Sequence, residues 1–456
     1  MDRHTFTRGT AFTRRAFLRR AAAVAAAPYV VSSSVLGADG AVAPSERITL
    51  GFIGVGMMGR GHVHCCVNYD DCQVVAVCDV DRWRRQNAKA TVEARYAAQG
   101  ASGAYRGCRA YNDLRDLLAR DDIDAVLIAT GDRWHAPATV LAAKAGKDIY
   151  CEKPVSLTIA GARAMVKAVR RYGLVFQSGL QQRSTVQFQK ACHLVAAGAI
   201  GKVKTVYVAF PGTSGDVGLP AEPVPDGLDW DLWLGPSPWR PYNRRFHPYG
   251  RPPHVVPWQF CRDFGGGNLT SNAVHAFDVV QWGLGMDESG PIEISPPEAG
   301  RHPVLTYRYA NGAVLKVVPW LLDRQRDDVP KGWDTGTRLA NFGALFVGEN
   351  GWVQVGRGGL LRAFPADVLQ RAPLPPRKPG HPVNNHHQNW LNCIRTRRRP
   401  ACDVAVGCQS TIVSHLGCIA HWTGRTLTWD PAKEVFPGDD EANRWRIRAT
   451  RAPWRL

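Results

Sequence analysis

Short apolar runs alternate with helical patterns along the first part of the chain. Runs with the length of buried strands occur at residues 48–53, 73–78, 124–129, 148–151 and 174–178. The segments between them, such as 82–98, 137–145 and 113–119 with Asn112 as its cap, have the apolar spacing of helices. Strands and helices that alternate in this way build a parallel sheet with helices on both faces. We therefore predict an α/β fold whose N-terminal domain, residues 44–178, is a doubly wound Rossmann sheet.

The pattern changes after residue 178. Strand candidates follow at residues 203–210, 304–309, 314–318, 344–347 and 352–355. Their alternating apolar and polar positions are typical of a mostly antiparallel sheet. We expect residues 179–456 to form a C-terminal α+β domain that binds substrate, with a helix over 185–197 and a surface helix over the NHHQNWLNCI segment at 385–394.

The N-terminal segment has the features of an export signal. The sequence TRRAFLR at residues 13–19 precedes an apolar run at 21–31 and a small-residue stretch that ends near Ala38 or Ala43. This arrangement resembles a twin-arginine signal, so we expect residues 1–43 to be a signal peptide and the mature protein to be periplasmic or extracellular. The alternative is a short amphipathic helix on the protein body. The run is shorter than the ~20 residues of a membrane-spanning helix, and no membrane span is expected.

Charge and cysteine content narrow the function classes. The 456 residues carry a formal net charge of +18, but the arginines are scattered and do not form the basic stripe of a nucleic-acid binder. The positive charge is explained by an anionic cofactor, an acidic substrate or a solvated surface. We expect no nucleic-acid partner. The twelve cysteines contain no CxxC pair. We expect mostly buried thiols, with one or two disulfides left open by the predicted export.

The strand at 48–53 runs directly into a G-x-G-x-x-G turn, after which a helical pattern continues. In a dinucleotide site the first glycine makes the tight turn, the second lets the backbone approach the pyrophosphate, and the third lets helix and strand pack closely. The next strand ends in Asp79, where an acid accepts hydrogen bonds from the adenosine ribose. We predict that NAD or NADP contacts Gly54, Gly56, Met57, Met58, Gly59 and Asp79.

The choice between NAD and NADP stays open at this point. The carboxylate of Asp79 would repel a 2′-phosphate and favours NAD. Arg82, Arg84 and Arg85 follow at once and would accommodate NADP. These arginines are equally consistent with the solvated first turn of the next helix.

The strand at 124–129 leads into the sequence Thr-Gly-Asp-Arg-Trp-His. Loops at the carboxyl ends of parallel strands line the cofactor crevice. For Trp134 and His135, packing of the following helix is the alternative. We expect cofactor contacts from Thr130, Asp132, Trp134 and His135.

The next strand ends in Glu152-Lys153-Pro154. The order of the glycine turn, the acid, the TGDRWH loop, the EKP tripeptide and a GGG segment at 265–267 that leads to a histidine resembles the Gfo/Idh/MocA family of oxidoreductases, over about residues 46–430. The resemblance implies that Lys153 lies beside the nicotinamide and handles the substrate hydroxyl. We expect the neighbouring Glu152 to hold and orient nearby cofactor or lysine groups. Partial burial and a positive nicotinamide ring would both lower the pKa of such a lysine.

A helical pattern after the GGG segment contains His275 and Asp278. Members of the family commonly place an aspartate four residues before this histidine, where this chain has Ser271. Serine supplies no negative charge, so either the pKa of His275 is lower or its partner is Asn272, Asp263 or a substrate group. We predict a catalytic His275, with a structural role as the alternative, and a structural Asp278.

Residues 229–264 are rich in aromatic side chains and proline. Aromatic faces stack on the C–H faces of sugars, so a carbohydrate or polyol substrate fits this segment. The alternative is that the rings pack among themselves over a sheet edge. The family resemblance also implies a homo-oligomer. Candidate substrate contacts are Gln182, Arg183, Trp239 and His275.

Two histidine clusters raise the question of a metal site. His62 and His64 precede Cys65 and Cys66 in the predicted helix after the glycine turn, where His64 should face away from His62. His386 and His387 begin the predicted surface helix. Neither cluster has a convincing ligand geometry, and we predict no metal.

These features predict an NAD(P)-dependent oxidoreductase that transfers hydride at a carbinol carbon of a sugar, polyol or glycoside. Free NAD is scarce outside the cytoplasm, so a redox-neutral cycle with a retained cofactor is the first alternative. Such a cycle would allow glycoside cleavage through a keto intermediate or hydride transfer between two sugars. A non-catalytic sugar-binding protein is the second alternative: Ser271 makes it conceivable, and the intact Lys153 argues against it.

Overall fold

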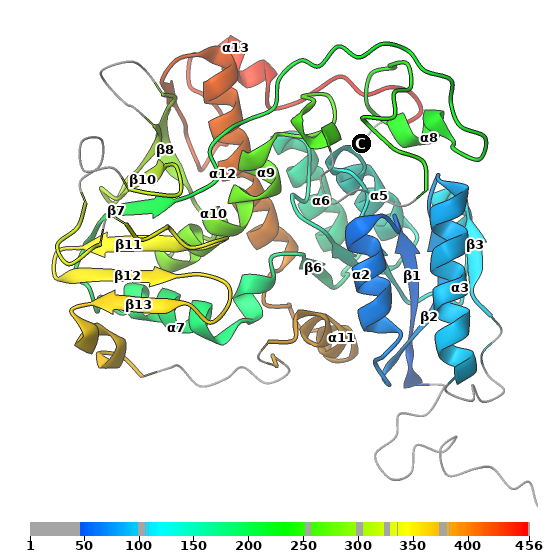
Figure 1. The fold of residues 1–456 in the computed structure, drawn as a ribbon, viewed down its shortest axis with the longest axis horizontal. Coiled ribbons are helices and arrows are strands. Elements are labelled where there is room, and N and C mark those ends of the chain that lie inside the picture. Colours follow the sequence, from blue (N-terminus) through cyan, green and yellow to red (C-terminus); the bar gives the residue numbers. More distant parts are fainter. Residues whose placement is uncertain are drawn as a thin grey trace, which may run out of the picture. The chain divides into compact units, whose positions relative to one another are not determined.

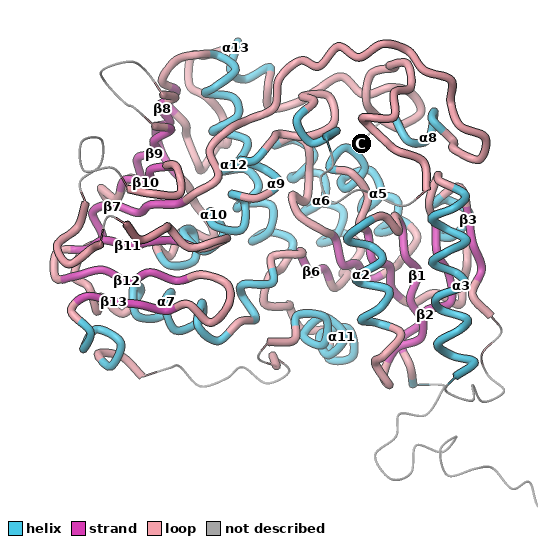
Figure 2. Tube along the Cα trace, viewed as in Figure 1, coloured by secondary structure: helices cyan, strands magenta, loops and turns pink. Residues whose placement is uncertain are grey.

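The computed structural model describes most of the chain after the predicted signal peptide, which itself lies outside the described residues. The described residues are 46–98, 105, 107–250, 257–297, 304–322, 329–334, 336–373, 381–382 and 384–454. Residues from Ile48 onward form one compact unit built on two sheets (Figures 1 and 2).

The first sheet has six strands in the order β3-β2-β1-β4-β5-β6, and all of its strand pairs are parallel. Its strands are β1 (Ile48–Ile53), β2 (Cys72–Cys78), β3 (Arg109–Tyr111), β4 (Ala125–Ile128), β5 (Asp148–Cys151) and β6 (Phe176–Ser178). The connecting helices are α2 (Met57–Cys66), α3 (Arg82–Ala98), α4 (Leu114–Leu118), α5 (Asp132–Lys144) and α6 (Ile159–Arg171). The strand order reverses between β1 and β4, which is the switch point at which dinucleotides bind. The predicted doubly wound sheet is confirmed.

Two helix starts differ from the prediction. Asp113, and not Asn112, caps α4, because the Asp113 carboxylate accepts a hydrogen bond from the Arg115 N–H. Helix α5 begins at Asp132, five residues before the predicted start, and contains Pro137. The prediction was wrong because proline is most favourable at the first helical position and suggested a start there. Trp134 and His135 therefore lie in a helix and not in a loop.

The second sheet has eight strands in the order β13-β12-β11-β7-β10-β9-β8-β14. Only the β7–β10 pair is parallel, so the predicted mostly antiparallel sheet is confirmed. Its strands are β7 (Val203–Val208), β8 (Pro291–Ser295), β9 (Leu305–Tyr309), β10 (Val314–Val317), β11 (Ala344–Gly348), β12 (Gly351–Val355), β13 (Leu361–Phe364) and β14 (Leu427–Thr428). The helices of this half are α7 (Val186–Ala196), α8 (Trp230–Leu234), α9 (Asn268–Ser271), α10 (Ala273–Gly283), α11 (His386–Thr396), α12 (Val404–Thr423) and α13 (Asp440–Arg444), with short 3-10 turns η3 (Gln181–Ser184), η4 (Pro257–Phe260) and η5 (Ala366–Gln370).

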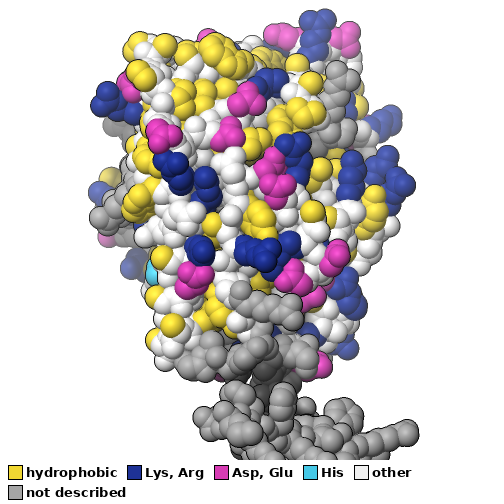
Figure 3. Space-filling model, turned by 90° about the vertical axis from the view of Figure 1, so that its right-hand side faces the viewer, with side chains coloured by type: hydrophobic (Ala, Val, Ile, Leu, Met, Phe, Trp, Pro, Cys, Tyr) yellow, Lys and Arg dark blue, Asp and Glu magenta, His cyan; other side chains and the backbone are white. Residues whose placement is uncertain are grey.

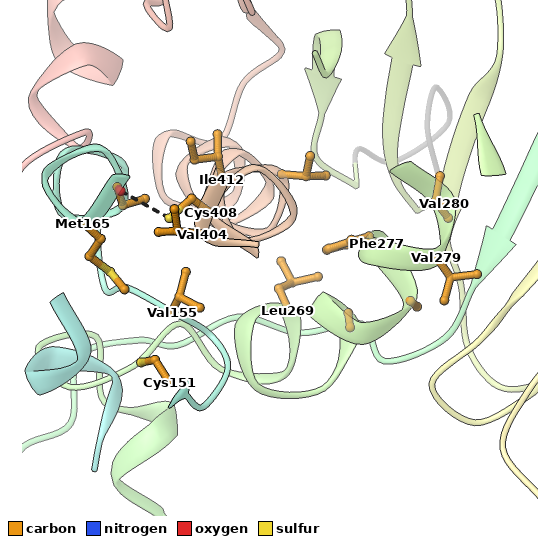
Figure 4. Packing of buried hydrophobic residues seen from close by; sticks show 14 of the residues in the cluster. Cys151, Val155, Met165, Leu269, Phe277, Val279, Val280, Val404, Cys408 and Ile412 are labelled. Carbon is orange, nitrogen blue, oxygen red and sulfur yellow. Dashed lines mark hydrogen bonds between the residues drawn. The ribbon is translucent and has the colours of Figure 1, made fainter. Parts of the chain in front are cut away.

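One apolar core joins the two halves. Helix α12 contributes Val404, Cys408 and Ile412 between Met165 of α6 and Phe277 of α10 (Figure 4). Because such a core excludes water from both sides of α12, the two sheets are held in a fixed relation around the switch point.

The predicted helix is present as α11, and one of its faces is buried. Trp390 of α11 is fully buried and packs with Leu391 and Cys393 in the same cluster as Val63 of α2 and Val92 of α3. The segment is amphipathic, and its sequence alone did not show that its apolar face covers the first sheet.

The surface charges and the cysteines have the distribution that was expected from the sequence. On the face that includes α3 and β3, basic and acidic side chains are intermixed (Figure 3). All twelve cysteines are free thiols, and only Cys65 is exposed, so the prediction of mostly buried thiols is confirmed. In the described part of the chain, no helix is both long and apolar enough to cross a membrane.

Candidate functional site

A pocket lies at the carboxyl ends of β1, β2 and β4, where the strand order reverses. Seven of the residues predicted to contact the cofactor line it: Gly54, Gly56, Met57, Met58, Asp79, Thr130 and Trp134. Gly59, Asp132, His135, Glu152 and Lys153 lie outside this lining. The pocket therefore corresponds to the adenosine and pyrophosphate end of a dinucleotide site, and the proton-handling candidates lie beyond it.

The glycine turn has the geometry that a pyrophosphate requires. Gly54 has a φ of +86°, and a Cβ there would lie 2.8 Å from the backbone of Ala129. A Cβ on Gly59 would overlap the Gly54 carbonyl oxygen. Gly56 caps α2, so the free N–H groups at the start of this helix face the pocket. These features fit a bound dinucleotide.

The carboxylate of Asp79 is held by the backbone at the end of β2. It accepts hydrogen bonds from the Val55 N–H (2.9 Å) and the Asp81 N–H (3.0 Å). These bonds fix an acid in the pocket lining, where it can accept hydrogen bonds from the hydroxyls of the adenosine ribose.

The three arginines that follow Asp79 are already engaged. Arg82 pairs with the carboxylate of Asp226 (2.8 Å). Arg84 donates to the carbonyl oxygens of residues 248 and 250. Arg85 donates to the Asp79 carbonyl at 3.1 Å. Arg84 and Arg85 are bonded to backbone carbonyls, Arg82 is paired at the surface, and the pocket lining holds an acid, so the site fits NAD better than NADP.

The aromatic segment packs against the cofactor pocket. Among its side chains, the pocket is lined by Leu232, Trp233, Phe246, His247, Pro248, Pro257 and Trp258. Several of its rings pack in their own cluster, which includes Trp230, Trp233, Tyr242, Phe246 and Phe264. Trp239, a predicted substrate contact, is 67% exposed and is not part of the lining. We call residues 228–250 and 257–264 the aromatic cover.

Buried polar contacts fasten the aromatic cover to the nucleotide domain. The fully buried Asp81 accepts hydrogen bonds from the His247 ring (3.2 Å) and the Gly250 N–H (2.8 Å). Burial alone would raise the pKa of Asp81, but these hydrogen bonds hold it below its usual value. Trp233 donates through its indole N–H to His247 (2.9 Å), and the guanidinium of Arg133 lies 3.7 Å from the Trp233 ring.

Lys153 follows β5 and is half-buried. Its Nζ donates a hydrogen bond of 2.6 Å to the backbone carbonyl of Ser271. Burial lowers the pKa of Lys153, and the charges of Glu152 and Asp132 oppose this shift only in part. The amine is thus biased toward its neutral form, in which it can accept a proton.

His275 is buried next to Lys153 and is held by Gln182. The Gln182 amide fits its surroundings when its nitrogen donates to Nδ1 of His275 (2.9 Å) and its oxygen accepts from Nε and Nη2 of Arg357 (3.0 and 3.1 Å). With Nδ1 as acceptor, the neutral ring carries its proton on Nε2. Burial, with the charges of Lys153 and Arg357, lowers the pKa of His275 well below its usual value.

The position at which family members commonly have an aspartate holds a serine with an unused hydroxyl. The Oγ of Ser271 is buried and has no hydrogen-bond partner among the residues that the structure describes. Neither Asn272 nor Asp263 replaces the missing acid, because Asn272 bonds to Asn268 and Asp263 pairs with Arg240. The side-chain partner of His275 is instead the neutral amide of Gln182, which sequence reasoning placed only among the substrate contacts.

The two histidine clusters of the sequence are in contact next to Glu152, through His62 and His387. The buried carboxylate of Glu152 accepts hydrogen bonds from His62 (2.9 Å) and from the Gln181 amide (3.1 Å), and His62 in turn bonds to His387 (2.8 Å). Burial opposes ionisation of Glu152, but the contact with His62 and the charge and backbone N–H of Lys153 lower its pKa to about 2. As predicted, His64 faces away and is exposed. No group of three potential ligands suits a metal ion among the residues that the structure describes.

Asp132 offers a further contact for a cofactor. It is buried, and burial raises its pKa to about 7. In the described part of the chain, no donor bonds to its Oδ2. A buried carboxylate oxygen without a donor fits a ligand hydroxyl, such as those of a ribose. The neighbouring His135 instead contacts the carbonyl oxygens of Pro154 (2.6 Å) and Thr130 (3.2 Å), so its role is to hold the backbone.

The structure does not leave Arg183 free for substrate. Its buried guanidinium forms ion pairs with Asp278 (2.9 Å) and Asp287 (2.6 Å). Ser410 also donates to Asp278. Both Arg183 and Asp278 therefore hold helices together beside the site.

Sequence reasoning missed an aromatic wall next to His275. The guanidinium of Arg357 lies 4.0 Å from the Phe342 ring, which meets the His275 ring edge-on, with 5.3 Å between centroids. Phe210 lies beside Phe342 (4.9 Å) and Trp320 (4.5 Å). Phe210 and Phe342 have φ angles of +74° and +54°, which cost bulky residues roughly 1–3 kcal/mol and are typical of functional sites. These residues come from separate strand ends, and no local motif marks them.

Comparison with known proteins agrees with this geometry. The model of the Gfo/Idh/MocA oxidoreductase family with its NAD-binding Rossmann fold matches residues 48–180, and the C-terminal α/β domain of the same family matches residues 183–318 and 329–456. The chain is 30% identical over 183 residues to myo-inositol 2-dehydrogenase of Thermotoga maritima, covering 40% of this chain and 47% of that protein. It is 30% identical over 198 residues to a glycosyl hydrolase family 109 protein of Shewanella, covering 40% of each.

The matched segment thus spans less than half of each of these curated relatives. Among solved structures, levoglucosan dehydrogenase in complex with NADH and levoglucosan has the same fold, with a TM-score of 0.54 at 18% identity, covering 84% of this chain and 99% of that one. Because the two family models together match both halves of the chain, the protein belongs to the Gfo/Idh/MocA oxidoreductase family, with an N-terminal NAD-binding Rossmann fold.

Proposed function

We propose that the protein is an NAD-dependent oxidoreductase that acts on a carbinol carbon of a sugar, polyol or glycoside. One observation carries the proposal. Lys153, whose pKa burial lowers, is held to the carbonyl of Ser271 one helical turn before the neutral His275, at the end of a strand beside the dinucleotide pocket. The names of the relatives, an inositol and a levoglucosan dehydrogenase, support a polyhydroxylated substrate.

Lys153 and His275 would have different roles in the reaction. Bound NAD⁺ would supply the hydride acceptor. The neutral amine of Lys153 accepts the proton of the substrate hydroxyl while its own N–H bond to Ser271 keeps it in place. His275 donates from Nε2 to the same substrate oxygen and stabilises the negative charge that develops there. Gln182 fixes the ring in this tautomer.

The decisive experiment combines nucleotide analysis with a matched pair of variants. Mass spectrometry of the nucleotide released on denaturation identifies the cofactor, and absorbance at the NADH band follows turnover on a panel of sugars and polyols. Lys153→Ala should keep its nucleotide and lose about 10²–10⁴-fold in kcat. Lys144→Ala removes an exposed lysine from α5 and should behave as the unmodified protein. Full activity of Lys153→Ala would refute the assignment.

A redox-neutral cycle with a retained cofactor is the second candidate. The buried contacts of Asp81, His247 and Arg133 that fasten the aromatic cover over the pocket favour slow nucleotide exchange. The relative named as a glycosyl hydrolase supports the same reading. Release of a cleaved or reduced sugar without net NADH would support this candidate, and accumulation of NADH in step with product would exclude it.

We further propose that residues 1–43 direct export of the folded protein by the twin-arginine route, so that the nucleotide is loaded before export. The double arginine at Arg14 and Arg15 supports this. Replacing both with lysine should keep the protein in the cytoplasm, as fractionation would show. We also propose a homo-oligomer, which light scattering of the purified protein would test.

A further inference from the structure

The guanidinium of Arg357 lacks a carboxylate partner at the reacting end of the site. It stands on the tip of the β12–β13 hairpin, which Gly358 and Gly359 turn through positive φ angles. The side chain is exposed. Among the residues that the structure describes, no carboxylate forms an ion pair with it, and the acid that acts on it electrostatically is Glu152. The oxygens of Glu152 are already bonded to other groups, so Glu152 does not neutralise this cation.

The contacts that the described residues make with Arg357 fix the orientation of its guanidinium and leave one of its edges without a partner. Nε and Nη2 donate to the same oxygen of Gln182 (3.0 and 3.1 Å). The plane of the guanidinium rests on Phe342 (4.0 Å). The remaining edge, formed by Nη1 and Nη2, has the two parallel N–H bonds that bind a carboxylate in a bidentate manner.

This cation lies close to the two proton-handling candidates. Its charge lowers the pKa of both Lys153 and His275, so in the free protein it disfavours positive charge on either group. An anion bound to the open edge would remove this repulsion. A ligand that brings its own negative charge therefore fits the site better than a neutral ligand.

The aromatic rings next to Arg357 indicate which kind of ligand carries the negative charge. Phe342, Phe210 and Trp320 form a half-buried aromatic wall, and such faces stack on the C–H faces of a sugar ring. The two parallel N–H bonds of this edge match the two oxygens of a carboxylate, whereas a phosphate group paired in the same bidentate way keeps a further charged oxygen for which this edge has no donor.

We propose that Arg357 determines specificity by binding the carboxylate of an acidic sugar, of which a hexuronate is the simplest example. The carboxylate pairs with the Nη1–Nη2 edge, the ring lies against the aromatic wall, and a carbinol carbon of the same ring faces Lys153. This inference rests on the proposed oxidoreductase function and names its substrate class.

The test compares acids with their neutral counterparts in the nucleotide-loaded protein. Glucuronate, galacturonate and mannuronate are paired with the matching hexoses, and glucose 6-phosphate and galactose 6-phosphate form a phosphate arm. Two readouts are used: kcat/KM from the NADH band and affinity from calorimetry. The acid should exceed its neutral partner by about 10–100-fold, the range expected for a charge-assisted bidentate hydrogen bond.

Variants separate Arg357 from general effects, because the acid-to-neutral ratio is measured within each protein. The ratio should fall to near one in Arg357→Gln and to an intermediate value in Arg357→Lys, which keeps the charge without the fork. Arg362→Gln removes an exposed guanidinium from β13 of the same hairpin and should keep the full ratio.

Several results would overturn the inference. These are equal use of acids and neutral sugars, an unchanged ratio in Arg357→Gln, a preference for the sugar phosphates, and no binding of any acid in calorimetry. The proposed function fails differently. If acids bind in an Arg357-dependent manner but Lys153→Ala matches the unmodified protein, the carboxylate site stands and the oxidoreductase assignment does not.

Discussion

Asp81 and His247 form a buried hydrogen bond of 3.2 Å that joins the nucleotide domain to the aromatic cover. The two residues are separated by 166 positions in the sequence. Nδ1 of His247 accepts from the Trp233 indole, so the proton on Nε2 points at Asp81. Arg84 of α3 also contacts this buried carboxylate, but the two hydrogen bonds that Oδ2 accepts from His247 and Gly250 exist only while the cover is closed.

His247→Ala should loosen the aromatic cover and release nucleotide faster. The variant leaves the buried carboxylate of Asp81 without one of its donors, which costs about 1.5–3 kcal/mol for a hydrogen bond to a charged group. If this cost lowers the free energy needed to open the cover, the nucleotide dissociates about tenfold faster or more. Retention after gel filtration and release in stopped-flow measure this. His64→Ala, an exposed histidine of α2, is the control, and equal release rates in the two variants would refute the role of the cover.

Ser271→Asp should move the pH dependence of turnover toward higher pH. A carboxylate at this position lies beside Lys153 and His275 and favours their charged forms, which raises both pKa values. Because Lys153 accepts a proton only when neutral, the acidic limb of kcat/KM shifts upward by about one unit, equivalent to about 1.4 kcal/mol.

The control is Ser271→Asn, because asparagine is similar in size to aspartate and carries no charge. This variant should leave the acidic limb of kcat/KM at the pH of the unmodified protein. If the aspartate variant shows no shift, proton acceptance does not involve Lys153. The unused hydroxyl of Ser271 makes the site suitable for this exchange, since no existing hydrogen bond is broken.

The nucleotide half of the site was predictable because each of its signals is local. Glycines at 54, 56 and 59 and an acid at 79 follow directly from strands that are recognisable as apolar runs. Their function depends on backbone geometry within one βαβ unit, and that geometry follows from a short stretch of sequence.

The reacting end was only partly predictable. Lys153 and His275 stood out through the family resemblance, but their partners come from distant elements. Gln182, Phe342 and Arg357 meet at His275 from η3, the segment before β11 and the β12–β13 tip. No periodicity encodes such a meeting, because it depends on the register of the second sheet.

The aromatic segment shows the same limit. Its composition predicted a surface for a sugar, with rings that pack among themselves as the alternative, and several of the rings do pack in one cluster. It did not indicate that the segment lines the cofactor pocket. Trp233 and Trp258 line the cofactor pocket, whereas Trp239 points to solvent. A run of aromatic residues indicates buried area, and the covered surface is decided by tertiary contacts such as that of Arg84 with residues 248 and 250.

Gln182→Glu should abolish the preference for acidic sugars. The new carboxylate would accept from Arg357 and occupy it with an internal ion pair, so that an anionic ligand no longer finds an unpaired cation. It would also raise the pKa of His275 by direct contact. The acid-to-neutral ratio should approach that of Arg357→Gln, while the nucleotide content stays unchanged, because Gln182 does not line the pocket. An unchanged ratio would contradict the link between the two residues.

His62→Leu should reduce stability at neutral pH and flatten its dependence on acid. The pKa of Glu152 in the fold is about 2, below the usual 4.5 of a glutamate, so its ionised form stabilises the native state above about pH 4.5. This contribution, at most about 3 kcal/mol, is lost as the pH falls from about 4.5 toward 2. Removing His62 takes away the strongest of the contacts that lower this pKa, so the variant starts less stable and loses less on acidification. Urea unfolding between pH 3 and 7 measures both effects. Parallel stability curves for His62→Leu and the unmodified protein would show that Glu152 does not depend on this histidine.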